Sequence, residues 1–247
     1  MSRQFASASS QSLNAGSAPA SAPPFTMACW CLQDSSAIMT MMSIGDTTSA
    51  TDFFKIIMTD SSLGHEVWAQ ERFSAGFRTA QSTAGASGTG ELVHACGVFE
   101  TTSLRHAYFN GANKGTLNSA GGAGSANDLY IGAEAKSSPA IFMNGRVAEA
   151  AVWNAVLTDT EVAILGLGVS PLFVRPASLV FYSPLIRAED RDVVGGLTLT
   201  ANNSPTVSVH PPIIRPSAQI MQFPPAGAAP ATTIPVFMHQ YRQRRII

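Results

Sequence analysis

The sequence predicts an all-β protein, an antiparallel sandwich of two sheets that carries one short helix. Short runs of strand composition recur about every 8–12 residues and end in turn residues, a spacing typical of β-sandwiches. One stretch combines a helix-capping signal with a following apolar turn. The 247 residues can form one large β domain or two small domains with a buried core.

The first expected strands follow residue 24 in close succession. They are the runs FTMACWCL (25–32), AIMTMMSIGD (37–46), DFFKIIMTDS (52–61) and HEVWAQERF (65–73). In the last run the odd-numbered residues from Val67 to Phe73 are expected on one side, since successive side chains of a strand point to opposite faces. Residues 76–90 then run from a strand into a loop rich in Gly, Ser and Thr.

The clearest hairpin signal lies between residues 92 and 111. The strand-like runs 92–99 and 104–109 flank the polar turn ETTS. The second run ends in Asn110-Gly111, which favours a type I′ turn because both central residues need a positive φ. The run DLYIGAE (128–134) is a further expected strand after a Gly-rich loop.

Residues 144–165 begin as a strand and end as a helix. Alternation along the strand predicts Ala148, Ala150 and Val152 on one face. The sequence TDTE (158–161) is a capping box, and the glycines that follow the next apolar turn would end the helix. We expect this helix to plug the edge of the sandwich.

Five sequence motifs resemble those of the concanavalin A-like jelly rolls of the laminin-G and pentraxin type. The motifs are FTMACW (25–30), HACGVF (94–99), YFNG (108–111), LYIG (129–132) and FMNGRVAEAAVWNAVLTDTEV (142–162). They occur in the order that the family shows. The resemblance implies a two-sheet jelly-roll sandwich.

The chain departs from the family pattern at two places. Ala148-Glu149 stands where the family often carries Asp-Glu, which weakens the transfer of a metal- or sugar-linked role to this strand. Family domains also begin with a strand before the FT motif, whereas here a similar segment occurs late, within residues 178–210. We therefore predict a sandwich domain over residues 25–210 in which 178–210 supplies permuted strands that cover an edge.

Both ends of the chain are predicted to be extended arms. Residues 1–24 are rich in Ser, Ala and Pro, and residues 211–247 contain seven prolines, which disfavour a packed domain. The C-terminal arm nevertheless carries large apolar side chains that a solvated linker does not need. We expect it to bind neighbouring subunits, through contact residues Ile213, Ile214, Phe223, Phe237, Tyr241 and Arg242.

Composition narrows the possible partners. Charged residues make up 13% of the chain, against roughly 25% in typical soluble domains, so the surface is either polar and uncharged or covered by partners. A net charge of −1 favours neither nucleic acid nor anionic lipid, and no apolar run predicts a membrane span. The three cysteines and the absence of a secretory signal at the N-terminus predict reduced thiols made in a cytoplasm.

The sequence contains no recognisable catalytic motif, so we predict that the protein is not an enzyme and binds no cofactor other than a possible calcium ion. The acids of AEDRD (188–192) are interpreted as a solvated turn instead of the paired carboxylates of a glycosidase. The calcium candidate is Asp128, because the resembling family often binds calcium through loop acids. Trp68 is the glycan candidate, and Trp30 is interpreted as a core residue.

Two functions remain open on these observations. The first is a structural protein of a phage virion, a capsid decoration or fibre-associated protein. It would assemble in the host cytoplasm as a homo-oligomer or as part of a larger assembly, through arms that bind the major capsid protein or neighbouring copies. The alternative is a lectin-like carbohydrate-binding module, possibly calcium-dependent, that attaches to glycans.

Overall fold

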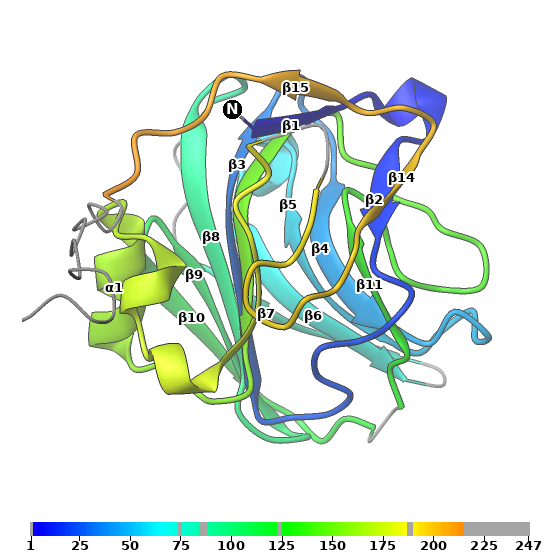
Figure 1. Cartoon of the computed structure of the whole chain (residues 1–247). Helices are drawn as coiled ribbons and strands as arrows, with labels where there is room; N and C mark the ends of the chain where they lie inside the picture. The colour runs from blue at the N-terminus through cyan, green and yellow to red at the C-terminus, as the bar shows by residue number, and fades with distance from the viewer. Residues whose placement is uncertain (1, 74–75, 84–87, 123–124, 187–189, 215–247) are drawn as a thin grey trace, which may run out of the picture. The chain divides into compact units, whose positions relative to one another are not determined.

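The computed structural model describes residues 2–73, 76–83, 88–122, 125–186 and 190–214. These residues form the predicted antiparallel sandwich of two sheets (Figure 1). The first sheet has the order β10-β9-β8-β3-β12-β1-β15, with β13 also paired to β12, and the second has the order β14-β2-β11-β4-β5-β6-β7. The strands are β1 Ser2–Phe5, β2 Ser12–Asn14, β3 Phe25–Gln33, β4 Met39–Gly45, β5 Phe53–Met58, β6 Val67–Phe73, β7 Gly76–Gln81, β8 Leu92–Phe99, β9 Leu104–Phe109, β10 Ala112–Asn118, β11 Asp128–Ile131, β12 Gly145–Trp153, β13 Leu179–Ser183, β14 Thr200–Asn202 and β15 Thr206–Ser208. The α-helix among them is α1 Asp159–Gly166, and short 3₁₀ turns span Ser7–Ser9, Ser61–Leu63, Pro171–Phe173 and Pro176–Ser178.

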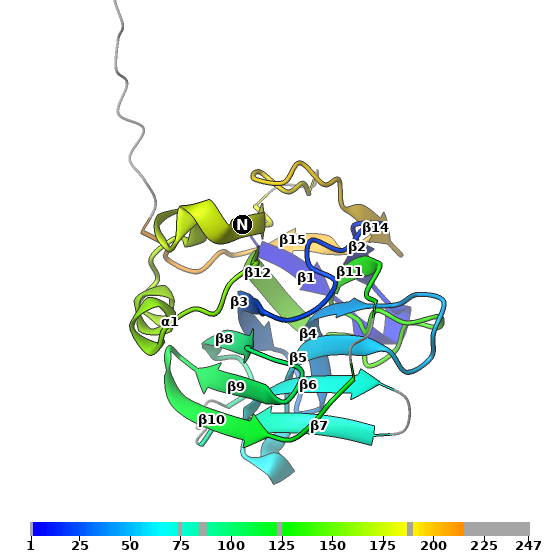
Figure 2. The ribbon, with the colours of Figure 1, turned by 90° about the horizontal axis from the view of Figure 1, so that it is seen from below.

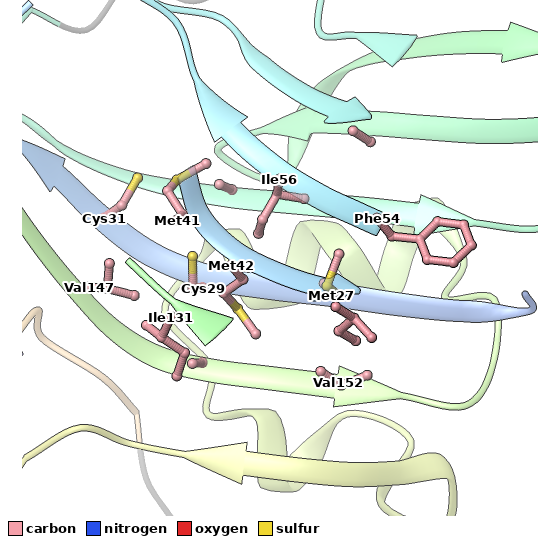
Figure 3. Packing of buried hydrophobic residues seen from close by; sticks show 14 of the residues in the cluster. Met27, Cys29, Cys31, Met41, Met42, Phe54, Ile56, Ile131, Val147 and Val152 are labelled. Carbon is pink, nitrogen blue, oxygen red and sulfur yellow. The ribbon is translucent and has the colours of Figure 1, made fainter. Parts of the chain in front are cut away.

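The main core lies between the inner faces of the two sheets and is rich in sulfur-containing side chains (Figure 3). Labelled members are Met27, Cys29, Cys31, Val147 and Val152 from the first sheet, and Met41, Met42, Phe54, Ile56 and Ile131 from the second. All three cysteines of the chain are buried free thiols. Burial raises the pKa of the Cys29 thiol well above its ordinary value, so the thiols act here as small apolar side chains.

One ion pair lies within this core. Val67, Ala69 and Phe73 of β6 point inward, as the alternation predicted, and Glu71 shares their face. Its carboxylate lies 3.2 Å from the Arg105 guanidinium of β9, and both side chains are fully buried. Burial raises the pKa of Glu71 against the opposing pull of Arg105, so the ion pair offsets part of the cost of burying this carboxyl.

The N-terminal segment is part of the sandwich, which corrects the expectation of an extended arm over residues 1–24. β1 lies between β12 and β15 in the first sheet, and β2 lies between β11 and β14 in the second. These strands are held in place by main-chain hydrogen bonds to their neighbours. Their sequence has only a weak apolar pattern, so the pattern did not predict them. Figure 2 shows β1 beside β15 at one end of the first sheet.

Strands from residues 178–210 join both sheets. β13 pairs with β12 from Leu179 to Ser183, β14 pairs with β2, and β15 pairs with β1. The acids that follow β13 correct another expectation, because Asp190 and Asp192 are buried instead of lying in a solvated turn. Asp190 lies 2.8 Å from Arg3 of β1, and Asp192 accepts the main-chain N–H of Tyr182 at 2.9 Å. Both acids therefore fasten this late segment to the sandwich.

A bulge in β12 changes which side chains share a face. The register with β3 shifts between Ala148 and Ala151, and Glu149 has a positive φ of 52°. As a result Val147, Ala150 and Val152 point into the main core, in place of the predicted set that began at Ala148. On the side of β12 that does not pair with β3, the neighbouring strand also changes at the bulge. It is β1 before the bulge and β13 after it.

The helix α1 covers a sheet face, which corrects the expectation that it plugs an edge. Its capping box is confirmed, with the Thr158 hydroxyl accepting from the Glu161 amide. Val162 and Leu165 pack with Trp153 and Tyr108 on the outer face of the first sheet, beyond the main core. Figure 1 shows α1 alongside β9 and β10 on that side of the molecule.

The C-terminal arm is described only as far as Ile214. Ile214 forms a parallel bridge with Val169, donating its main-chain N–H to the Gly168 carbonyl at 2.7 Å, and its side chain is exposed. Ile213 is half-buried beside it. The other predicted contact residues, Phe223, Phe237, Tyr241 and Arg242, lie outside the described residues.

Candidate functional site

The outer face of β6 and β7 presents a row of polar and aromatic side chains. The register pairs Trp68, Gln70 and Arg72 of β6 with Gln81, Thr79 and Phe77 of β7, in that order. Because the alternate residues of β6 point into the core, these six side chains point away from it. We call this set the β6–β7 face.

The Phe77 end of this face carries an exposed aromatic ring. Phe77 is 54% exposed, and its ring centroid lies 6.4 Å from that of Phe53, a fully buried residue that the register places in the same cross-strand row, on the other side of Arg72. The Arg72 guanidinium lies 4.8 Å from the Phe77 centroid, a cation–π contact that fixes the ring against the sheet. The result is an exposed aromatic platform that is supported from the side by its cross-strand neighbours.

The other end of the face carries Trp68, the residue that the sequence singled out as the glycan candidate. Trp68 is half-buried, and its indole N–H donates to the Glu66 carboxylate at 2.8 Å. It stands four residues from Arg72 on the same strand, so the two ends of the face are about 14 Å apart at about 3.4 Å per residue. Between them the Gln70 amide donates to the Thr79 hydroxyl at 2.7 Å.

A cluster of charges adjoins the Phe77 platform. Lys55 of β5 lies with its ammonium 5.6 Å from the Phe77 centroid and forms an ion pair with Glu134, in the loop that follows β11. Lys136 of the same loop lies 2.8 Å from the other oxygen of Glu134. Burial lowers the pKa of Lys55 and raises that of Glu134, but the attraction between Glu134 and the two lysines leaves the pKa of this carboxyl below its ordinary value.

This arrangement suits recognition of a flat, polar ligand. An aromatic ring offers an apolar face to the C–H groups of a sugar, and the exposed Gln81 amide and the half-buried Thr79 hydroxyl can exchange hydrogen bonds with its hydroxyl groups. None of the six side chains of the β6–β7 face is a carboxylate, whereas glycoside hydrolysis ordinarily uses a pair of them. These six side chains therefore offer aromatic and polar contacts, and no acid–base pair is among them.

Sequence reasoning found Trp68 and missed the rest of this face. Phe77 and Arg72 stand on two consecutive runs that the sequence already marked as strands, and two residues separate these runs, so their cross-strand pairing was foreseeable. The approach of Lys55 and Glu134 was not foreseeable in this way, because it depends on a long loop that returns over the sheet.

The calcium candidate lies elsewhere, at the start of β11. Asp128 is buried and accepts the Asn14 side-chain amide at 3.2 Å and the Leu129 main-chain N–H at 2.8 Å. Burial raises its pKa above the ordinary value. Within the part of the chain that the structure describes, no three His, Cys, Asp or Glu side chains gather as a metal site. Amide donors suit an anion and compete with a cation, so Asp128 holds β2 to β11, and calcium binding there stays a prediction.

The strand that resembles the family's closing strand carries a buried acid. Glu149, at the bulge of β12, accepts the Tyr182 hydroxyl at 2.6 Å and lies 3.1 Å from the His210 Nε2 atom.

Trp30, interpreted from the sequence as core, is half-buried on the outer face of the first sheet, beside a hollow of about 240 Å³. Pro211 and Pro212 form one wall of this hollow, which is mostly apolar.

Comparison with known proteins places this architecture. A family model described as the concanavalin A-like lectin/glucanases superfamily matches residues 6–163. The chain belongs to this superfamily. The resemblance drawn from the five motifs, and the jelly-roll sandwich that it implied, are thereby confirmed. No curated protein matches the chain.

Two solved structures share the superfamily fold with this chain. The heptameric SAP-like pentraxin of Limulus polyphemus is 17% identical with a TM-score of 0.54, over 63% of this chain and 75% of that one. A proposed carbohydrate binding protein from Bacteroides ovatus is 16% identical with a TM-score of 0.59. That match covers 86% of this chain and 61% of the other, so this chain spans less than two thirds of its length. At these identities the likeness concerns the fold alone.

Proposed function

We propose that this protein is a non-enzymatic carbohydrate-binding module that binds a saccharide across the β6–β7 face. The observation that carries the proposal is the supported, 54% exposed ring of Phe77 in one row with Thr79, Gln70 and Trp68. Membership of a superfamily named for lectins and glucanases supports this reading. The Bacteroides ovatus neighbour, itself described as carbohydrate binding, adds support through its fold.

The proposal is tested by a glycan array followed by calorimetric titration of each positive saccharide. We expect Phe77→Ala to weaken binding about tenfold or more, since loss of an aromatic contact of about 1.4 kcal/mol corresponds to that factor. Trp68→Ala should weaken the binding of longer saccharides more than that of short ones, because Trp68 lies at the far end of the face.

Phe173→Ala is the matched control for Phe77→Ala. Phe173 is 51% exposed and belongs to the 3₁₀ turn Pro171–Phe173 near α1, away from the β6–β7 face. It should leave every affinity unchanged. Equal losses in the two variants, or no loss in Phe77→Ala, would contradict the proposed site. An array without a single positive, with and without calcium, would contradict the proposed function.

The assembly function predicted from the sequence stays a prediction. Neither of the two similar structures reported above is described as a virion component, and four of the six predicted contact residues lie outside the described residues. Truncation after Ile214 tests it. The assembly prediction requires that the shortened protein keeps its sandwich and loses self-association or incorporation into particles. Among the described residues, no helix is long and apolar enough to cross a membrane.

A further inference from the structure

We infer that the saccharide recognised at the β6–β7 face is acidic, and that its carboxylate or sulfate group is bound beside Arg72 at the Phe77 platform. The inference rests on the proposed function and narrows its ligand class. It comes from the charges around Phe77, which a neutral sugar would not require.

Cations outnumber anions at this platform. Arg72, Lys55 and Lys136 meet there from β6, β5 and the loop after β11, and Glu134 is the carboxylate that lies among them. One carboxylate offsets one of the three positive charges, so an excess of two remains among these four side chains. Repulsion from Lys136 and Arg72 adds to the effect of burial in lowering the pKa of Lys55, which shows that the three cations lie within electrostatic reach of one another.

The charge of Arg72 is incompletely satisfied by the protein. Its Nε–H is buried and finds no hydrogen-bond acceptor among the described residues. The Arg72 side chain as a whole is half-buried, and the terminal N–H groups of a guanidinium match the two oxygens of a carboxylate or sulfate with parallel hydrogen bonds. An anionic group next to Arg72 would thus offset the surplus charge at the point where the ring contact orients the sugar.

The surplus is a local property of this site. The chain as a whole carries a net charge of −1, so the surplus of positive charge at this platform does not reflect a general attraction of the protein for polyanions. Lys55 is held in place by burial, with 3% of its surface exposed, and by its ion pair with Glu134. Charges fixed in this way attract an anion without first having to be ordered, which favours selective binding over diffuse attraction.

The experiment compares saccharides that differ in charge alone. Trigalacturonic acid is titrated against its trimethyl ester, and a sulfated κ-carrageenan hexasaccharide against its neutral, desulfated form, by calorimetry on the full chain. We expect trigalacturonic acid or the sulfated hexasaccharide to bind about tenfold or more tightly than its partner, because a hydrogen bond to a charged group adds about 1.5–3 kcal/mol. The pair that shows this difference identifies carboxylate or sulfate as the recognised group.

Arg72→Gln separates this inference from the proposed function. It should remove the preference for the acidic saccharide over its uncharged partner, whereas Phe77→Ala should weaken the binding of both by a similar factor and keep the preference. Arg146→Gln is the matched control, since Arg146 is a half-buried arginine of the first sheet whose Nε–H donates a hydrogen bond to the Gln4 side chain. It should change neither affinity, and unchanged melting temperatures should show that the variants are folded.

Several results would overturn the inference. If charged and uncharged partners bind equally, or if Arg72→Gln weakens them equally, the site does not select an anion, and the proposed carbohydrate binding still stands. If neither acidic saccharide binds while a neutral glycan binds through Phe77, the same conclusion follows. A preference for acid that survives Arg72→Gln would place the recognition elsewhere on the molecule.

Discussion

Burial of His94 predicts a loss of stability in mild acid. His94 of β8 is 2% exposed, its ring packs edge-on against Trp30 at 5.4 Å, and its Nδ1 atom has no hydrogen-bond partner among the described residues. Burial lowers the pKa of His94 from 6.5 to about 3. Below pH 6.5 the unfolded chain therefore binds a proton that the folded protein does not. The stability that depends on neutral His94 is present above pH 6.5 and is lost as the pH falls toward 3.

The size of this effect follows from the two pKa values. Between pH 7.5 and pH 5.0 the linkage relation gives a loss of about 2 kcal/mol from this one group. The variant His94→Phe keeps a ring against Trp30 and removes the titration. We expect urea unfolding at the two pH values to show that the wild type loses about 2 kcal/mol more than the variant. Other titrating groups are common to both proteins and cancel in this difference.

The comparison has a clear refuting result. If wild type and His94→Phe lose the same free energy of unfolding between the two pH values, His94 is protonated in the folded protein and its site is open to water. At pH 7.5 the variant should be as stable as the wild type or more stable, because it removes an unsatisfied buried nitrogen.

Three further predictions concern contacts that join distant segments. Burial raises the pKa of Asp190 from 3.8 to about 6, so the folded protein binds a proton there that the unfolded chain does not. As the pH rises from below 3.8 to above 6, the wild type should therefore lose about 3 kcal/mol of stability relative to Asp190→Asn in urea unfolding, and a pH-independent difference would refute the prediction. In Gly166→Ala the new Cβ would lie 2.7 Å from the Asn110 carbonyl carbon. We expect the free energy of unfolding to fall by about 1–3 kcal/mol, measured by thermal unfolding. An unchanged melting temperature would show that α1 does not pack tightly against the turn at Asn110. Thr158→Ala removes the helix cap and should lower the free energy of unfolding by about 1 kcal/mol, with Thr160→Ala as the control.

Local signals in the sequence were sufficient for the strands that bury a patterned face. The hairpin of β8 and β9, the inward face of β6 and the capping box of α1 were all legible because each is determined by a few neighbouring residues. β1 and β2 were not legible, since they are held by main-chain pairing to strands from the far end of the chain. The burial of Asp190 was missed for the same reason, because its partner Arg3 is distant in sequence.

The same distinction between local and long-range signals applies to the residues of the candidate site. Trp68 could be selected from the sequence because tryptophan on a strand is conspicuous by itself. Phe77 could be recognised as a candidate binding residue only from the structure. The register places Arg72 beside it, and the loop after β11 brings Glu134 to Lys55. The bulge at Glu149 is similar, since the strand pattern contains no signal for an extra residue in a ladder.

The location of the β6–β7 face follows from what covers the rest of the sandwich. On the outer face of the first sheet, α1 packs over β8, β9 and β12, and residues 209–212 pass beside Trp30. On the outer face of the second sheet, the loop after β11 lies over β4 and β5, where the Ala135 carbonyl takes the space of a side chain at Gly45. That loop reaches Lys55 of β5, and the neighbouring residue of β6, Gln70, is still buried. The exposed side chains of this face, Phe77 and Gln81, therefore lie on β7, and the loop after β11 supplies the charged border of the site on the side of β5.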